Sequence, residues 1–94
     1  MTPKEAVAVA KDYVADLFAS DGTRNIGLEE LRFDGRQGHW LVTIGFSRDW
    51  EGPQGLSRWA GGREEGGWSR TFKTVEINDA DGRVVELRHW PAAA

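Results

Sequence analysis

Apolar residues change their spacing along this chain, from a helical period near the start to an alternating period later. The first stretch carries an apolar stripe at intervals of three and four residues: Ala6, Ala10, Tyr13 and Leu17, widened by Val7, Val14 and Phe18. This spacing places the apolar side chains on one face of an amphipathic helix. It predicts a helix over residues 3–20.

The ends of this helix carry capping signals. Thr2 suits the N-cap position, and Pro3 suits the first helical position because its missing N–H has no helical partner there. Glu5 completes a capping box with Thr2. At the other end, residues 20–22 read Ser-Asp-Gly, and glycine readily adopts the left-handed conformation that ends helices. We expect the helix to stop there.

Four later segments predict β-strands: residues 28–34, 39–47, 72–77 and 84–90. The second of them, HWLVTIGFS, is rich in β-branched and aromatic residues, which favour strands. The last two are joined through Asp81-Gly82, a strong hairpin signal. The sequence therefore predicts a single α+β domain over residues 1–94, with one N-terminal helix packed on a three- to four-stranded antiparallel sheet.

Turn geometry and alternation predict which residues pair in this sheet. With Gly82 in the left-handed position of a three-residue turn, and one register for both hairpins, the expected pairs are Ile77 with Val85, Val75 with Leu87, and Phe46 with Phe72. Leu41 and Thr43 then share a face with the aliphatic pairs. The opposite face carries Trp40, Val42, Ile44, Phe46, Phe72 and Trp90, beside Glu76, Glu86 and Arg88. One helix covers one face of a sheet, so this second apolar face is expected to need another cover.

Residues 48–70 (RDWEGPQGLSRWAGGREEGGWSR) place Trp50, Trp59 and Trp68 nine residues apart among six glycines. We expect a long Trp/Gly-rich hairpin arm, with Trp50 opposite Trp68 and Trp59 at the tip. Arginines 48, 58 and 70 lie close enough in sequence to stack on the indoles. Three interpretations stay open: the arm closes the domain's own core, binds a ligand or partner, or is a disordered linker.

Composition narrows the function classes. Twelve Lys and Arg against fifteen Asp and Glu give a net charge of −3, which argues against nucleic-acid binding through bulk electrostatics. The chain has no cysteine, which excludes disulfides and thiol chemistry and fits a reducing cytosol. Charged residues interrupt every apolar run, so we expect neither a signal peptide nor a membrane span and assign the protein to the cytoplasm.

Catalytic and metal motifs are few. His39 and His89 lack a third ligand at a metal-binding spacing, and residues 61–67 (GGREEGG) lack the Lys-Ser/Thr of a phosphate-binding loop. No cofactor is expected. Glu76 and Glu86 are predicted to face each other across the last hairpin. They are either solvated beside Arg88 or form a carboxylate pair in a pocket with Trp40, Val42 and Phe72.

The segments HWLVTIGF and FKTVEINDADGRVVELR, following an N-terminal helix, resemble small domains of the PepSY and cystatin-like type. The resemblance covers about 60 residues, and its most specific element is the strand, Asp-Gly turn and strand near the end. It implies a helix on an antiparallel sheet and a role in binding or restraining partners such as peptidases. The Gln-x-Val-x-Gly inhibitory loop of cystatins is not found.

Taken together, the sequence predicts a non-catalytic binding module that associates with a protein partner or a second copy of itself. The expected binding residues are Trp50, Trp59, Trp68, Arg58, Phe46, Phe72, Trp40 and Trp90, because tryptophan and arginine dominate interface energetics. One alternative is a small-molecule-binding or enzymatic cavity in a curled sheet, with Glu76 and Glu86 as its polar groups. Another is a small acidic inhibitor of the immunity or antitoxin type.

Overall fold

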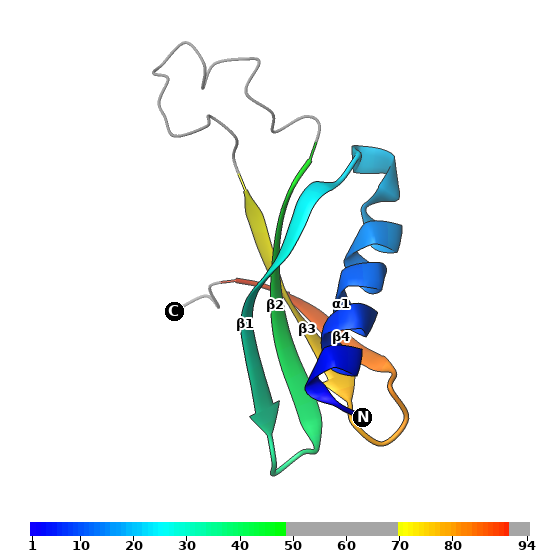
Figure 1. The fold of residues 1–94 in the computed structure, drawn as a ribbon, viewed down its shortest axis with the longest axis vertical. Helices are drawn as coiled ribbons and strands as arrows, with labels where there is room; N and C mark the ends of the chain where they lie inside the picture. The colour runs from blue at the N-terminus through cyan, green and yellow to red at the C-terminus, as the bar shows by residue number, and fades with distance from the viewer. Residues whose placement is uncertain (49–69, 91–94) are drawn as a thin grey trace.

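The computed structural model describes residues 1–48 and 70–90 and packs an N-terminal helix on a four-stranded antiparallel sheet (Figure 1). The elements are α1 (Pro3–Leu17), the short 3-10 helix η1 (Ala19–Asp21), β1 (Arg24–Asp34), β2 (His39–Ser47), β3 (Thr71–Asn78) and β4 (Val84–His89). The strand order is β1-β2-β3-β4, so every strand pairs with its neighbour in sequence. The predicted α+β architecture is confirmed.

Helix α1 begins as its sequence predicts. Thr2 Oγ1 accepts a hydrogen bond from the Glu5 amide at 3.1 Å, and Glu5 Oε1 accepts one from the Thr2 amide at 2.7 Å, which completes the capping box. The α-helix ends at Leu17, three residues before the predicted end, because the chain tightens into η1. Gly22 then takes the left-handed conformation, with φ of 70°, as expected.

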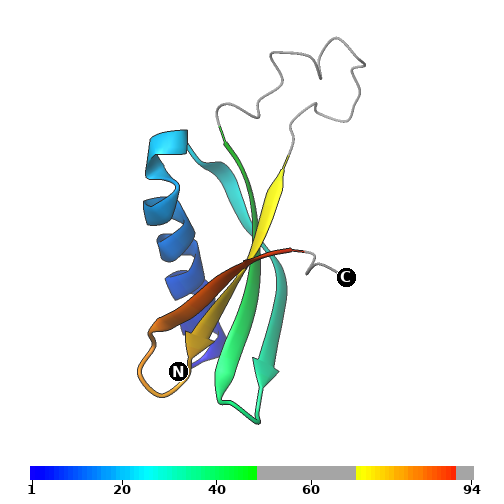
Figure 2. The same cartoon turned by 180° about the vertical axis from the view of Figure 1, so that it is seen from behind.

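The core lies between α1 and one face of the sheet. Its fully buried apolar residues are Ala6, Ala10 and Val14 of α1, Val42, Ile44 and Phe46 of β2, and Val75 and Ile77 of β3. The two alanines let the helix approach the sheet closely, so the larger strand side chains fill the space. In Figure 2 the helix lies at the left and β4 crosses in front of its lower part, so the view is from the side of the sheet opposite the helix.

The predicted register between β2 and β3 is wrong by one residue. Val42 pairs with Val75, and Phe46 pairs with Thr71 instead of Phe72. Because side chains alternate, this shift moves each β2 side chain to the face opposite the predicted one, while those of β3 keep theirs. The open apolar face expected for Trp40, Val42, Ile44 and Phe46 does not exist, since these side chains lie on the helix side. This register places Val42, Ile44 and Phe46 of β2 together with Val75 and Ile77 of β3, and α1 buries all five.

The β3–β4 hairpin follows its prediction except at the turn. Val75 pairs with Leu87, and Gly82 is left-handed with φ of 72°, as predicted. Ile77, however, pairs with Val84 instead of Val85, because a register shift falls between Glu76 and Ile77. The shift leaves Val85 exposed.

Strand β1 is longer than predicted, because it begins at Arg24 instead of residue 28. Two register shifts, between Arg24 and Gly27 and between Leu28 and Glu30, break its pairing with β2. Such irregularities hide the simple alternation that sequence analysis looks for.

Most of the predicted arm over residues 48–70 lies outside the described residues. Trp50, Trp59, Trp68 and Arg58 are therefore not placed, and neither is the expected pairing of Trp50 with Trp68. The first residue of that stretch, Arg48, lies on the helix side, with its guanidinium 5.2 Å from the centre of the Phe18 ring. It donates to Asp21 Oδ2 at 3.4 Å and to Thr71 Oγ1 at 3.1 Å.

Replacing Phe46 with alanine should lower the free energy of unfolding by about 3–5 kcal/mol, because the fully buried ring leaves a cavity. The ring centre lies 5.0 Å from that of Phe18. Urea unfolding measures the loss. The control Phe33→Ala removes a ring that is 48% exposed and should cost less than about 1.5 kcal/mol. Equal, small losses for both variants would contradict the observed register.

Candidate functional site

The sheet face turned away from α1 is called the open face below. Its residues follow from the register: Glu30 and Arg32 of β1, His39, Leu41, Thr43 and Gly45 of β2, Phe72, Thr74 and Glu76 of β3, and Glu86 and Arg88 of β4, with Trp90 beyond its end. Charged and hydroxyl side chains alternate here with a few large apolar ones. No helix among the described residues covers this face (Figure 2).

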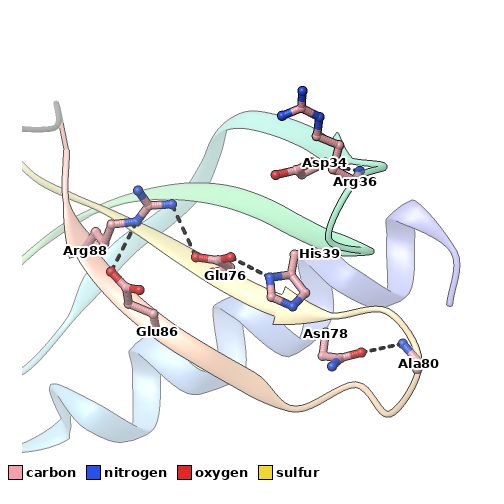
Figure 3. A network of polar contacts seen from close by, with 8 residues as sticks. All are labelled: Asp34, Arg36, His39, Glu76, Asn78, Ala80, Glu86 and Arg88. Atoms are coloured by element: carbon pink, nitrogen blue, oxygen red, sulfur yellow. Dashed lines mark hydrogen bonds and ion pairs between the residues drawn. The ribbon is translucent and has the colours of Figure 1, made fainter.

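A buried carboxylate organises one part of the open face. Glu76 is only 8% exposed, although it lies on the uncovered side of the sheet. His39 Nδ1 donates to Glu76 Oε2 at 2.5 Å, and Arg88 Nη2 donates to Glu76 Oε1 at 3.3 Å. Arg88 Nε also lies 3.5 Å from Glu86 Oε2. Figure 3 shows these four side chains linked from His39 through Glu76 and Arg88 to Glu86, and we call them the Glu76 network.

Glu76 and Glu86 are direct cross-strand partners in the β3–β4 hairpin, which confirms the prediction that they face each other. Arg88 lies between the carboxylates and offsets their repulsion. The first alternative, two solvated carboxylates beside Arg88, is correct for Glu86, which is 52% exposed, and wrong for Glu76, which is 8% exposed. The second alternative, a pocket with Trp40 and Val42, is wrong, because these two residues lie on the helix side. Both carboxylates thus have cationic partners within the protein.

Two predicted binding residues, Phe72 and Trp90, do meet on the open face. Their ring centres are 5.4 Å apart, and the Trp90 amide donates to the Phe72 carbonyl at 3.1 Å. The Phe72 ring crosses Gly45, where a Cβ atom would lie 2.7 Å from Phe72 Cε1. The Arg70 guanidinium also lies here, 5.9 Å from the Phe72 ring centre. Glycine at position 45 is therefore required for this close approach.

The other two described candidates, Phe46 and Trp40, are not on the open face. Phe46 is completely buried under α1, so it is unavailable to a partner. Trp40 packs its ring 4.8 Å from that of Phe33, and its indole Nε1 donates to Asp79 Oδ1 at 2.8 Å. Both positions were misassigned for the same reason, the one-residue error in the β2–β3 register.

A depression of about 170 Å³ hollows the open face. Its lining residues are Glu30, Arg32, Leu41, Thr43, Thr74, Arg88, His89 and Trp90. Thr43 and Thr74 are direct cross-strand partners, and their hydroxyls share a hydrogen bond of 2.9 Å. We call this depression the anchor pocket. Except for Trp90, none of these residues is predicted from the sequence as a binding residue, because their convergence depends on the registers of three strand pairs.

Residues 1–48 and 70–90 were searched for a metal site and for a membrane-spanning helix. No group of three or more His, Asp or Glu side chains there could hold a metal ion. No helix in the same part of the chain is long and apolar enough to cross a membrane.

Comparisons with known proteins gave no match to a family model, to a curated protein or to a solved structure. The resemblance to PepSY and cystatin-like domains therefore stays a prediction from the sequence.

Replacing Glu76 with glutamine should destabilise the fold by about 1–3 kcal/mol, because a neutral amide weakens two charge-assisted contacts of a buried group. The matched variant Glu86→Gln alters a carboxylate that is 52% exposed and should cost less than about 1 kcal/mol. Urea unfolding measures the loss in the free energy of unfolding for each variant. A loss for Glu86→Gln equal to that for Glu76→Gln would contradict the organising role of Glu76.

The surroundings of Asp79 make the free energy of unfolding depend on pH. The hydrogen bond from Trp40 lowers the pKa of this carboxyl below its usual 3.8, and the neighbouring amino group of Met1, 3.3 Å away, also lowers it, against partial burial. The charged form therefore stabilises the fold near neutrality, and this contribution is lost as the pH falls through the lowered pKa. Asp79→Asn should show a shallower loss of unfolding free energy between about pH 6 and about pH 2.5. If the unfolding free energies of Asp79→Asn and of the natural protein fell in parallel with pH, the assignment of this pH dependence to Asp79 would be wrong.

Proposed function

We propose that this protein is a non-catalytic binding module that docks a segment of another protein on its open face. The observation that carries the proposal is the anchor pocket, a small hollow with mixed lining at the surface of a sheet that no described helix covers. Docking surfaces commonly combine such pockets with aromatic and arginine side chains around them.

The size of the anchor pocket favours a single side chain over a cofactor. Sites for small molecules usually measure about 300–1,000 Å³. A cavity of about 150 Å³ holds one benzene ring. At about 170 Å³, and open to solvent, the anchor pocket suits one residue of a larger partner. This comparison disfavours the alternative of a small-molecule-binding or enzymatic cavity.

The side chains around the pocket are of the kinds that supply binding energy. Trp90 is 38% exposed and packs against Phe72, which fixes the orientation of its ring. Leu41 also lines the pocket. Large, partly fixed aromatic groups lose little conformational entropy on binding, so they serve well as contact points.

The charges of the open face favour an acidic partner. Arg32, Arg70 and Glu30 form no ion pair with any residue in the described ranges, whereas Glu76 and Glu86 are both engaged by Arg88. Unpaired arginines thus outnumber unpaired carboxylates on this face, which favours a partner that supplies a carboxylate. A second copy presents the same charges, and the apolar stripe of β2 that could have driven dimerisation is buried under α1. We expect the isolated chain to be a monomer.

The Trp/Arg-rich stretch stays part of this proposal on its sequence. Trp50, Trp59, Trp68 and Arg58 lie between β2 and β3 in the chain, and their residue types are those enriched in interfaces. A chain without cysteine suits a reducing compartment, so the cytoplasm is the proposed location.

Site-specific photocrosslinking tests the docking face. In the native host, p-benzoylphenylalanine replaces Leu41 of the open face or, as control, the exposed Asp12 of α1. Only the first position should give a discrete adduct with another protein, which mass spectrometry identifies. Binding is then measured with both purified proteins, where Trp90→Ala should weaken affinity at least about tenfold. The exposed Leu17 of α1 provides the matched control, Leu17→Ala, with unchanged affinity.

Two outcomes would overturn the proposal. One is an adduct between two copies of this chain, together with a dimeric mass by light scattering. The other is a purified partner whose affinity is indifferent to Trp90→Ala.

A further inference from the structure

The anchor pocket brings together side chains from all four strands or their ends. Glu30 of β1, Thr43 of β2, Thr74 of β3 and Arg88 of β4 form one continuous cross-strand row. Arg32 lies two residues along β1 from Glu30, on the same face, opposite Leu41. The two edge strands therefore each contribute an arginine to the lining, while the inner strands contribute hydroxyls.

The two arginines differ in how they are held. Arg88 is fixed from two sides, because its Nη2 donates to Glu76 Oε1 and its Nε lies near Glu86 Oε2. In Figure 3 its remaining guanidinium nitrogen points away from both carboxylates. Arg32 has no ion pair within the described part of the chain. One guanidinium is thus preorganised, and the other has its charge available to a ligand.

The rest of the lining selects the kind of anion. Paired hydroxyls of Thr43 and Thr74 lie 2.9 Å apart, so they supply hydrogen-bonding groups next to the arginines. Leu41 and Trp90 supply apolar surface for a hydrocarbon stem. Glu30 also lines the pocket and would repel a doubly charged phosphate more strongly than a carboxylate. Arginine with a carboxylate forms a strong charge-assisted pair.

We propose that the anchor pocket accepts the carboxylate side chain of one glutamate or aspartate of the partner. The carboxylate lies between Arg32 and Arg88, and its methylene stem packs on Leu41 and Trp90. This assignment rests on the docking role proposed above and names the chemistry by which the partner is recognised. Glu30 competes for the same arginine and keeps the affinity of an isolated side chain low.

Titration of the purified chain with a blocked glutamate, N-acetyl-L-glutamate N-methylamide, tests the assignment by ¹H–¹⁵N NMR in low salt. We expect saturable shifts of the Thr43 and Thr74 amides and of the Trp90 indole N–H, with a dissociation constant on the order of 10 mM. Blocked glutamine should bind at least about tenfold more weakly, because it lacks the charge.

Variants locate the binding charge. Arg32→Gln should weaken blocked glutamate at least about tenfold, and Glu30→Gln should strengthen it severalfold by removing the competing carboxylate. The matched control is Arg36→Gln in the β1–β2 turn, because the Arg36 side chain is exposed and forms no ion pair with the residues that the structure describes, while its backbone amide donates to Asp34 Oδ1. That variant should bind like the natural protein.

Several results would overturn the carboxylate assignment: no saturable shifts, equal binding of blocked glutamine, indifference to Arg32→Gln, or tighter binding of inorganic phosphate. These failures are separable from failure of the docking role. If the probe does not bind while partner affinity still depends on Trp90, only the carboxylate assignment falls. If the probe binds while the partner is indifferent to Trp90, the docking role falls.

Discussion

The packing of one β2 stripe against α1 determines what every other part of the sheet can do. Val42, Ile44 and Phe46 are all fully buried beneath the small residues of the helix. A single helix covers one face of a sheet, so the choice of stripe also decides which side chains stay open. Burial of these three side chains contributes roughly 1.5–3 kcal/mol each, which is enough to fix the register against a one-residue slip.

The open face is stabilised by other means than a covering layer. Glu76 is buried between His39 and Arg88, and Arg88 also reaches Glu86, so both carboxylates have a cationic partner within the face. Elsewhere on the face, the Phe72 ring covers Gly45. These contacts hold Arg88 and the aromatic pair in place. Such preorganisation supports the proposed docking role, because a surface that is already ordered would lose little entropy on binding.

Local signals made the elements predictable, and long-range pairing limited the rest. The capping box at Thr2 and the left-handed Gly82 depend only on neighbouring residues, so both are predicted correctly from the sequence. The pairing of Glu76 with Glu86 also follows from one short turn. The β2–β3 register is different, because more than twenty residues separate these strands and no short turn constrains them. Both alternating sets of β2 contain apolar residues, so the pattern alone could not choose the buried set. The anchor pocket depends on that choice and was therefore missed.

The β2–β3 register is the central claim, and interstrand NMR contacts measure it directly. Nuclear Overhauser effects should connect Val42 with Val75 across the two strands, and the Phe46 ring with the Phe18 ring under the helix. Contacts of Val42 with Glu76 and of Leu41 with Ile77, with no contact between the Phe46 and Phe18 rings, would contradict it. In that case the open face would be apolar, and the anchor pocket would lose its lining.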